Sequence, residues 1–167
     1  PTEAPTQQAQ TTQAAPTEQP IPEPDLVQQL LEEMTLEQKV GQLFLVRPDS
    51  LDLSQTQDQI NDAKADGVTE LTDAMRQTLA EYPVGGLVIF GKNLESPQQI
   101  TQFLDDLQQA SDTPLFAAID EEGGLVARLA NNAVFDLPQY ESAAAVGTSG
   151  NPEDARAMGR TIGGYFK

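Results

Sequence analysis

The chain has 167 residues, with 9 Lys and Arg against 26 Asp and Glu, a net charge of −17, and neither Cys nor His. The length favours one domain, or one domain with a tail, and the strong acidity makes nucleic acid and anionic membranes poor partners. Without Cys or His, this chain cannot form disulfides, metal sites with thiolate or His ligands, or a catalytic site that uses imidazole. No apolar run approaches the roughly 18–20 residues of a transmembrane segment.

Residues 1–24 differ in composition from the rest of the chain. They hold six of the twelve prolines, and Ile21 is their one large apolar residue. Such a segment cannot bury enough apolar surface to offset the entropy of ordering it, so we predict a disordered linker. It could be a tail without a function of its own. It could also be a spacer behind a membrane anchor or export signal, which would make the protein extracellular or attached to the cell surface, as in exported bacterial proteins.

Two helices and a strand are predicted next. Asp25 can cap a first helix, and Thr35 begins a second one with Gln38 at the capping-box position. The first helix carries its apolar residues at Leu26, Val27, Leu30, Leu31 and Met34. The apolar run at residues 43–46 predicts the first strand.

A long polar connection, residues 47–65, separates this strand from the next helix. We expect it to contain a short helix of its own. Its acids, at positions 49, 52, 58 and 62, do not have the spacing of a calcium-binding loop. We therefore interpret them as a solvated face. Leu71, Met75, Leu79 and Tyr82 then predict a helix over 69–82, and the apolar run 85–90 predicts a second buried strand.

The last predicted elements repeat this alternation. Ser96, Pro97 and Gln99 predict the start of a helix with a capping box. Residues 115–120 predict a third buried strand that ends at Asp120, and Asn151-Pro152 predicts the start of a final helix. Strands that alternate with helices indicate parallel βαβ units and an α/β fold. Three strands are too few for a closed eight-stranded barrel, so residues 25–167 are interpreted as the first part of a larger barrel domain.

The segment AIDEEGGLVAR, residues 118–128, is the most informative part of the sequence. It places Asp120 at the carboxyl end of a strand, the end at which parallel α/β proteins bind ligands. Arg128 lies eight residues further on, near enough to return to the same rim. The alternative is a plain strand end with solvated acids and a turn. Two of these acids could suggest a glycosidase pair, but adjacent strand residues point to opposite faces.

At these residues the chain resembles the N-terminal part of a glycoside hydrolase family 3 β-N-acetylhexosaminidase. The resemblance rests on four stretches in family order, namely MTLEQKVGQLFLV (34–46), VGGLVIFGKNL (84–94), SPQQITQFLDDLQQAS (96–111) and PLFAAIDEEGGLVARL (114–129). The segment 150–166 extends it almost to the end of the chain. The Asp-x-Glu-Gly-Gly-x-Val-x-Arg run is the most specific of these features.

The resemblance implies a TIM-like (β/α)8 barrel and a retaining mechanism that removes terminal β-linked N-acetylglucosamine. It assigns substrate binding to Asp120 and Arg128, and shaping of the pocket to Glu122, Gly123 and Gly124. One position departs from the family, because Leu125 stands where an Arg is usual. We interpret this as the loss of a rim or structural ion pair.

The resemblance also indicates what this chain does not supply. In the family, the nucleophilic Asp and the His-containing loop of the acid/base lie downstream, so no catalytic residue is assigned within this chain and we expect it to be inactive alone. No metal or organic cofactor is expected. The partners expected are a carbohydrate with terminal N-acetylglucosamine and the remainder of the same barrel. The complete protein is then a hydrolase of peptidoglycan fragments or chitin-type oligosaccharides, or, alternatively, a truncated, non-catalytic homologue that binds glycans or a protein.

Overall fold

The computed structural model describes residues 25–166. The linker predicted for residues 1–24 lies outside the described residues. The chain divides into two units, with the boundary between Glu33 and Met34. Of the first unit, the structure describes the helix α1 (Leu26–Glu33), whose first turn is capped by the Asp25 carboxylate, which accepts hydrogen bonds from the N–H groups of Val27 and Gln28. None of the α1 residues is buried.

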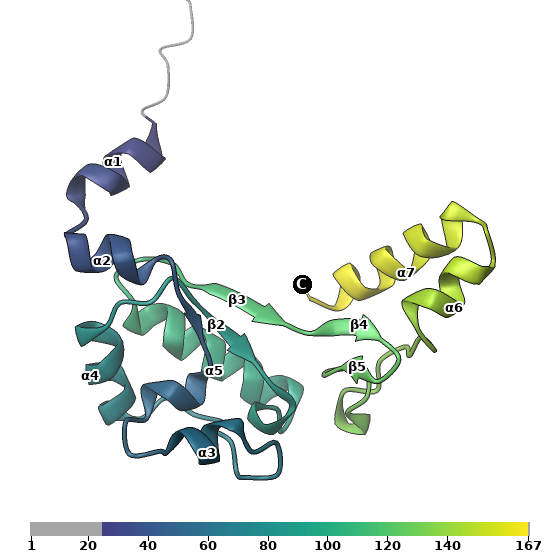
Figure 1. Ribbon diagram of the computed structural model, residues 1–167, viewed down its shortest axis with the longest axis horizontal. Coiled ribbons are helices and arrows are strands. Elements are labelled where there is room, and N and C mark those ends of the chain that lie inside the picture. Colours follow the sequence, from purple (N-terminus) through teal and green to yellow (C-terminus); the bar gives the residue numbers. More distant parts are fainter. Residues whose placement is uncertain (1–24, 167) are drawn as a thin grey trace, which may run out of the picture. The chain divides into compact units, whose positions relative to one another are not determined.

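The second unit contains a parallel sheet of three strands in the order β1-β2-β3 (Figure 1). The strands are β1 (Leu45–Val46), β2 (Gly86–Ile89) and β3 (Phe116–Ile119). Leu45 is in register with Gly86, which in turn is in register with Phe116. The predicted α/β fold with parallel strands and intervening helices is confirmed, and the strands form an open sheet.

Helices begin where the sequence supplies a capping side chain. The helix α2 (Leu36–Gly41) has the predicted capping box between Thr35 and Gln38, and the short helix α3 (Gln57–Asn61) has another between Thr56 and Gln59. Short 3-10 turns, η1 (Pro48–Leu51) and η2 (Gly91–Asn93), follow the first two strands. The helix α4 (Asp73–Glu81) begins at the cap of Thr72, four residues later than predicted.

The helix α5 (Pro97–Ala110) begins at the predicted cap, Ser96, but without the predicted box. Gln99 instead accepts the N–H of Glu95, and its amide donates to the carbonyls of Thr69 and Asn93. Gln99 therefore ties two loops to the start of α5.

The core lies between the sheet and the helices α4 and α5. It consists of buried apolar side chains from β2, α4, α5 and the segments beside them: Leu51, Met75, Leu79, Val84, Leu87, Phe103, Leu107 and Leu115. The prediction that the third strand is buried is wrong, since Phe116 is 72% exposed. The reason is that Leu87, in the core beside α4 and α5, is in register with Ala117, so the neighbouring Phe116 points to the other face of the sheet.

Beyond β3 the chain forms a small hairpin and two helices. The strands β4 (Glu121–Gly123) and β5 (Val126–Ala127) pair antiparallel, and the 3-10 turn η3 (Ala133–Phe135) follows them. The helix α6 (Ala143–Thr148) was not predicted, whereas α7 (Pro152–Tyr165) begins at the predicted cap, Asn151. No helix among the described residues is long and apolar enough to cross a membrane.

Candidate functional site

Asp120 and Arg128, the two residues predicted to bind a ligand, lie in contact. Asp120 directly follows β3, at the carboxyl end of the sheet, and its backbone carbonyl accepts the N–H of Arg128 at 3.1 Å. The Arg128 Nη2 atom lies 3.3 Å from the Asp120 Oδ2 atom. The two side chains are 33% (Arg128) and 44% (Asp120) exposed, so a ligand can reach both charged groups.

Arg128 is only partly engaged by the protein. Its guanidinium lies 5.5 Å from the centre of the Phe90 ring, at the end of β2, and Arg47 stacks on the same ring at 4.2 Å. The Arg128 Nε atom is buried and has no hydrogen-bond partner among residues 25–166. The rim at the carboxyl ends of the strands thus brings together a carboxylate, two guanidinium groups and an aromatic ring. Arg47 donates to the Ile60 carbonyl and to Asn61. Asp120, in contrast, can accept hydrogen bonds from hydroxyl or amide groups of a ligand, and Arg128 can donate hydrogen bonds to such groups.

Gly123 and Gly124 form the turn of the hairpin that carries Arg128 back to Asp120. Their φ angles are +83° and +63°, values that L side chains rarely adopt. A Cβ atom on Gly124 would lie 2.6 Å from the carbonyl oxygen of Glu141. This geometry supports the shaping role expected of the two glycines, which stays a prediction. Leu125, at the tip, is 98% exposed, and the interpretation of a lost ion pair there is likewise untested.

The two glutamates between Asp120 and the glycines have different surroundings. Glu122 is exposed. Glu121 accepts hydrogen bonds from the backbone N–H groups of Leu129 and Ala130, at 2.9 and 3.0 Å, and from the Tyr165 hydroxyl at 3.0 Å. Burial and the neighbouring Glu121 carboxylate raise the pKa of Tyr165 to about 12, so this hydroxyl keeps its proton at neutral pH.

A buried polar network lies between the carboxyl ends of β1 and β2. Asp49 and Asn93 are fully buried, and the Lys92 Nζ atom lies 3.2 Å from Asp49 Oδ1. The Asn93 amide donates to Asp49 Oδ2 at 3.0 Å, and the N–H of Val68 donates to Asp49 Oδ1. The solvated face predicted for the acids of this segment is therefore wrong for Asp49. Among the described residues no group of acids is arranged to hold a metal ion.

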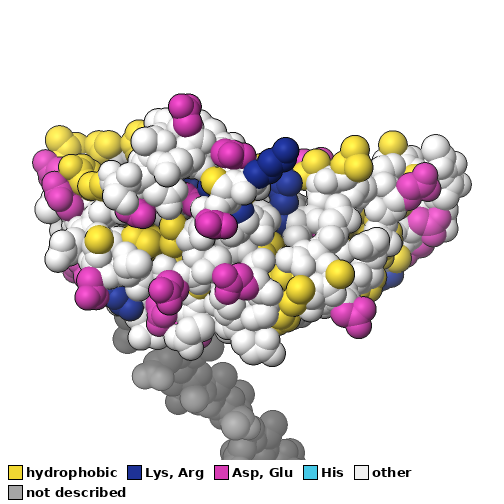
Figure 2. Space-filling view, turned by 90° about the horizontal axis from the view of Figure 1, so that it is seen from below, with side chains coloured by type: hydrophobic (Ala, Val, Ile, Leu, Met, Phe, Trp, Pro, Cys, Tyr) yellow, Lys and Arg dark blue, Asp and Glu magenta, His cyan; other side chains and the backbone are white. Residues whose placement is uncertain are grey.

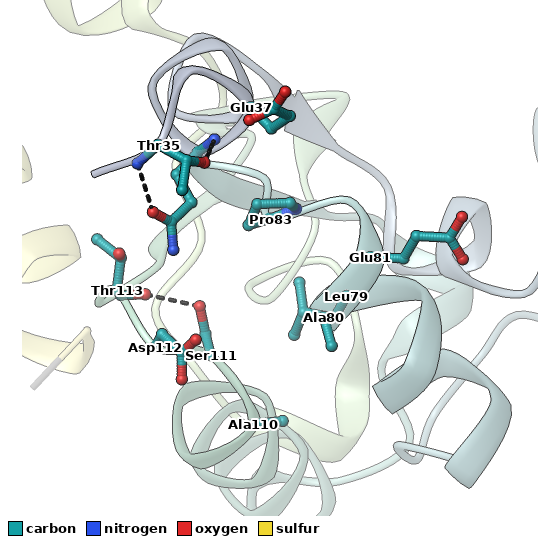
Figure 3. A pocket seen from close by; sticks show the side chains of 11 residues that line it. Thr35, Glu37, Leu79, Ala80, Glu81, Pro83, Ala110, Ser111, Asp112 and Thr113 are labelled. Carbon is teal, nitrogen blue, oxygen red and sulfur yellow. Dashed lines mark hydrogen bonds between the residues drawn. The ribbon is translucent and has the colours of Figure 1, made fainter. Parts of the chain in front are cut away.

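A cavity of about 340 Å³ lies at the opposite, amino-terminal end of the strands, where Thr35, Pro83 and Thr113 line it (Figure 3). Three acids, Glu37, Glu81 and Asp112, lie around it. Because parallel α/β proteins bind ligands at the carboxyl ends of their strands, we assign the functional site to the Asp120 rim.

Figure 2 shows acidic side chains spread over much of one face of the molecule, where basic ones are few.

Three features of this region were missed in the sequence: the hairpin, the three-way contact of Glu121 and the Asp49–Lys92 pair. The hairpin had a signal, since two glycines between short β-forming runs are typical of a tight turn. The contact of Glu121 with Tyr165 and the Asp49–Lys92 pair join residues 44 and 43 positions apart in the chain, respectively. Such distant pairs have no local signal.

Comparisons with known proteins bear on this region. A family model described as the Glycosyl hydrolase family 3 N terminal domain matches residues 35–165. A β-hexosaminidase of Thiobacillus denitrificans is 32% identical over 95 residues, which are 57% of this chain and 26% of that protein. A β-hexosaminidase of Bordetella avium is 36% identical over 69 residues, 41% of this chain and 20% of that protein.

One solved structure is similar in fold as well as in sequence. It is a glycoside hydrolase family 3 β-N-acetylglucosaminidase from Paenibacillus sp., which aligns with a TM-score of 0.59 and 31% identity over 78% of this chain. The alignment covers 21% of that enzyme. The chain thus spans about a quarter or less of the length of these relatives.

Proposed function

Since the chain belongs to glycosyl hydrolase family 3 through its N-terminal domain, residues 35–165, we propose that it is the sugar-binding part of a β-N-acetylglucosaminidase. The complete protein would remove terminal β-linked N-acetylglucosamine from peptidoglycan fragments or chitin-type oligosaccharides, with retention of configuration. The names of the relatives support this substrate class, since they are β-hexosaminidases and a β-N-acetylglucosaminidase.

The pairing of Asp120 with Arg128 is the observation that carries the proposal. A carboxylate accepts hydrogen bonds from sugar hydroxyls, and a guanidinium donates them in a fixed, planar arrangement. Each partner holds the other in place before the sugar arrives, which lowers the cost of ordering the site. In this proposal, Asp120 and Arg128 bind the terminal sugar through hydrogen bonds to its hydroxyl groups. Gly123 and Gly124 allow the hairpin to turn close to the sugar.

The reacting groups are proposed to come from polypeptide beyond Lys167. The relatives are about four to five times longer than the aligned segments, which leaves ample chain for a nucleophile and an acid/base. Both carboxylate oxygens of Glu121 are engaged with donors of the protein, so this residue is poorly placed to attack a sugar. The same additional chain would complete a TIM-like barrel around the three strands described here.

Export to the cell surface or the medium is proposed from composition alone. Residues 1–24 are rich in Pro, Thr and Gln and hold no Lys or Arg, as is common for spacers in exported bacterial proteins.

Turnover of a chromogenic β-N-acetylglucosaminide by the complete polypeptide tests the proposed function. We expect hydrolysis of this substrate, much slower hydrolysis of the matching β-glucoside, and no hydrolysis by residues 1–167 alone. If the complete polypeptide bound N-acetylglucosamine but did not hydrolyse the substrate, the proposed enzymatic activity would be contradicted. The protein would then be a non-catalytic homologue that binds glycans.

A further inference from the structure

Glu121 makes contacts with two other segments of the chain, one 8–9 residues away and one 44 residues away. Its Oε2 atom accepts the N–H of Leu129 at 2.9 Å, and its Oε1 atom accepts the N–H of Ala130 at 3.0 Å. The hydroxyl of Tyr165, near the end of α7, donates to the same Oε1 atom at 3.0 Å. One carboxylate therefore holds two successive backbone amides and the last turn of a helix.

These contacts lie directly beside Arg128. The backbone before the side chain is held by the hydrogen bond from the Arg128 N–H to the Asp120 carbonyl, at 3.1 Å. The backbone after it is held by Glu121 through Leu129 and Ala130. Among the described residues, the guanidinium itself has one carboxylate contact, at 3.3 Å, and a buried Nε atom without a partner. Besides Asp120 and the Phe90 ring, the backbone on either side of Arg128 therefore determines where the guanidinium lies.

We infer that Glu121 is a positioning residue for Arg128 in the sugar site, and that Tyr165 in turn fixes the Glu121 carboxylate. The inference rests on the proposed function, since Arg128 binds the sugar only if that function holds. Glu121 does not touch the sugar in this account. It sets the distance at which Arg128 can donate to a sugar hydroxyl and, at the same time, contact Asp120.

Charge and shape both favour a glutamate for this task. Its two oxygens accept from three donors, and hydrogen bonds to an ionised acceptor are stronger than those to a neutral one. A glutamine has one acceptor oxygen and would direct its NH2 group at an N–H or hydroxyl donor. Glu121→Gln therefore disturbs the contact with little change in volume. Tyr165→Phe is milder, because it removes one donor and leaves both backbone contacts intact.

A double-mutant cycle in the complete polypeptide tests the inference, with kcat/KM for a chromogenic β-N-acetylglucosaminide as the readout. We expect Glu121→Gln to lower kcat/KM about tenfold in the otherwise unchanged enzyme. In the Arg128→Ala background we expect the same change to alter kcat/KM by no more than about twofold, because the group that it positions is gone. Glu81→Gln, an exposed substitution at the amino-terminal end of the strands, serves as the control and should leave kcat/KM unchanged.

Tyr165→Phe provides a second cycle that does not depend on Glu121→Gln folding well. It should lower kcat/KM about two- to fivefold in the unchanged enzyme and have no further effect beside Arg128→Ala. The positioning role would be overturned if both Glu121→Gln and Tyr165→Phe lowered kcat/KM by the same factor in the unchanged enzyme and in Arg128→Ala. A loss that is merely structural would not depend on whether Arg128 is present. A complete wild-type polypeptide without turnover would instead overturn the proposed function.

Hydrogen exchange supplies a readout that is independent of turnover. In Glu121→Gln, the amides of Leu129 and Ala130 should exchange at least about tenfold faster. The amide of Gly124, which donates to the Tyr140 carbonyl at 2.8 Å, should keep its rate. Unchanged exchange at Leu129 and Ala130 would mean that Glu121 does not hold this backbone, and the inference would fail.

Discussion

Lys92 shows how an acidic protein buries a positive charge. Its side chain is 6% exposed, its ammonium group donates to the carbonyls of Gln59 and Ile60, and the Nζ atom forms an ion pair with Asp49. The ammonium group thus has three oxygen neighbours, and the fully buried Asp49 carboxylate accepts hydrogen bonds from Val68 and Asn93 beside its cation. Burial of two charges is tolerable only when both are satisfied in this way.

Lys92→Met should destabilise the fold strongly. It leaves the Asp49 carboxylate buried without its cation, and the loss of one partner of a buried pair costs about 3–5 kcal/mol. Urea unfolding measures the change. Lys39→Met, at an exposed position in the last turn of α2, should change the free energy of unfolding by less than about 0.5 kcal/mol. Similar values for the two variants would show that the network contributes little.

Tyr165 should give stability a dependence on alkaline pH. Its pKa is raised from 10 to about 12 by burial and by the carboxylate of Glu121. A raised pKa in the folded state means that the protonated form stabilises the fold below about pH 10, and that this contribution disappears as the pH rises toward 12. Ultraviolet titration should show a tyrosine that ionises near pH 12 and is missing from Tyr165→Phe. A lower midpoint for that component would contradict the contact with Glu121.

Most helices of this fold could be predicted from the sequence, because their signals are local, although α6 was not predicted and α4 begins four residues later than predicted. Thr35, Thr56, Thr72, Ser96 and Asn151 each accept a hydrogen bond from the backbone of the first helical turn. Strand burial was harder to predict. The apolar run around Phe116 has the composition of a fully covered strand, yet this residue is 72% exposed, since coverage depends on what packs against each face.

In the candidate site, too, the features with local signals could be predicted, and the contacts between distant segments could not. Asp120 and Arg128 could be placed at one rim because a strand end and a short return fix them locally. The contact of Glu121 with Tyr165 was not predicted, because Tyr165 lies 44 residues away on α7, and its contacts with the N–H groups of Leu129 and Ala130 depend on the hairpin, which was also missed. Likewise, Asp49 was interpreted as solvated, because its partner Lys92 follows a different strand. Local patterns predict elements, whereas contacts between distant elements need the assembled fold.

Two glycine substitutions should have opposite effects on stability. Gly124→Ala places a Cβ atom 2.6 Å from a backbone oxygen at a φ of +63°, so we expect a loss of about 1–3 kcal/mol. Gly159→Ala lies inside α7 with no heavy atom within 4 Å of the added carbon, and should gain about 0.5–1 kcal/mol. Thermal unfolding of the two variants decides this. A neutral Gly124→Ala would mean that the hairpin turn relaxes without cost.

Large apolar side chains remain exposed along the sheet, including Leu43, Phe44, Leu45 and Phe116. Among the described strands, β3 pairs with β2 alone, so its other edge is open to further pairing. An open edge beside exposed apolar side chains is a site for association. This surface is where we propose that the remainder of the barrel packs.

The chain expressed alone, residues 25–167, should therefore associate with itself. Sedimentation velocity should show species larger than a monomer whose share grows with protein concentration, and the complete polypeptide should not show them through this surface. A chain that stays monomeric at high concentration, with well-resolved amide signals from β3, would contradict the proposal that further strands cover this edge.

The central claim is that the rim formed by Asp120 and Arg128 binds the terminal sugar of a β-N-acetylglucosaminide. The most direct test compares kcat/KM of Asp120→Ala with that of Asp112→Ala, an exposed aspartate at the other end of the strands, in the complete polypeptide. A charged hydrogen bond contributes about 1.5–3 kcal/mol, so Asp120→Ala should lose about 10- to 100-fold or more, while its melting temperature stays close to that of the wild type. Asp112→Ala should lose less than about twofold. Near-wild-type kcat/KM in Asp120→Ala, in an enzyme that hydrolyses the substrate, would place the sugar elsewhere and contradict the account.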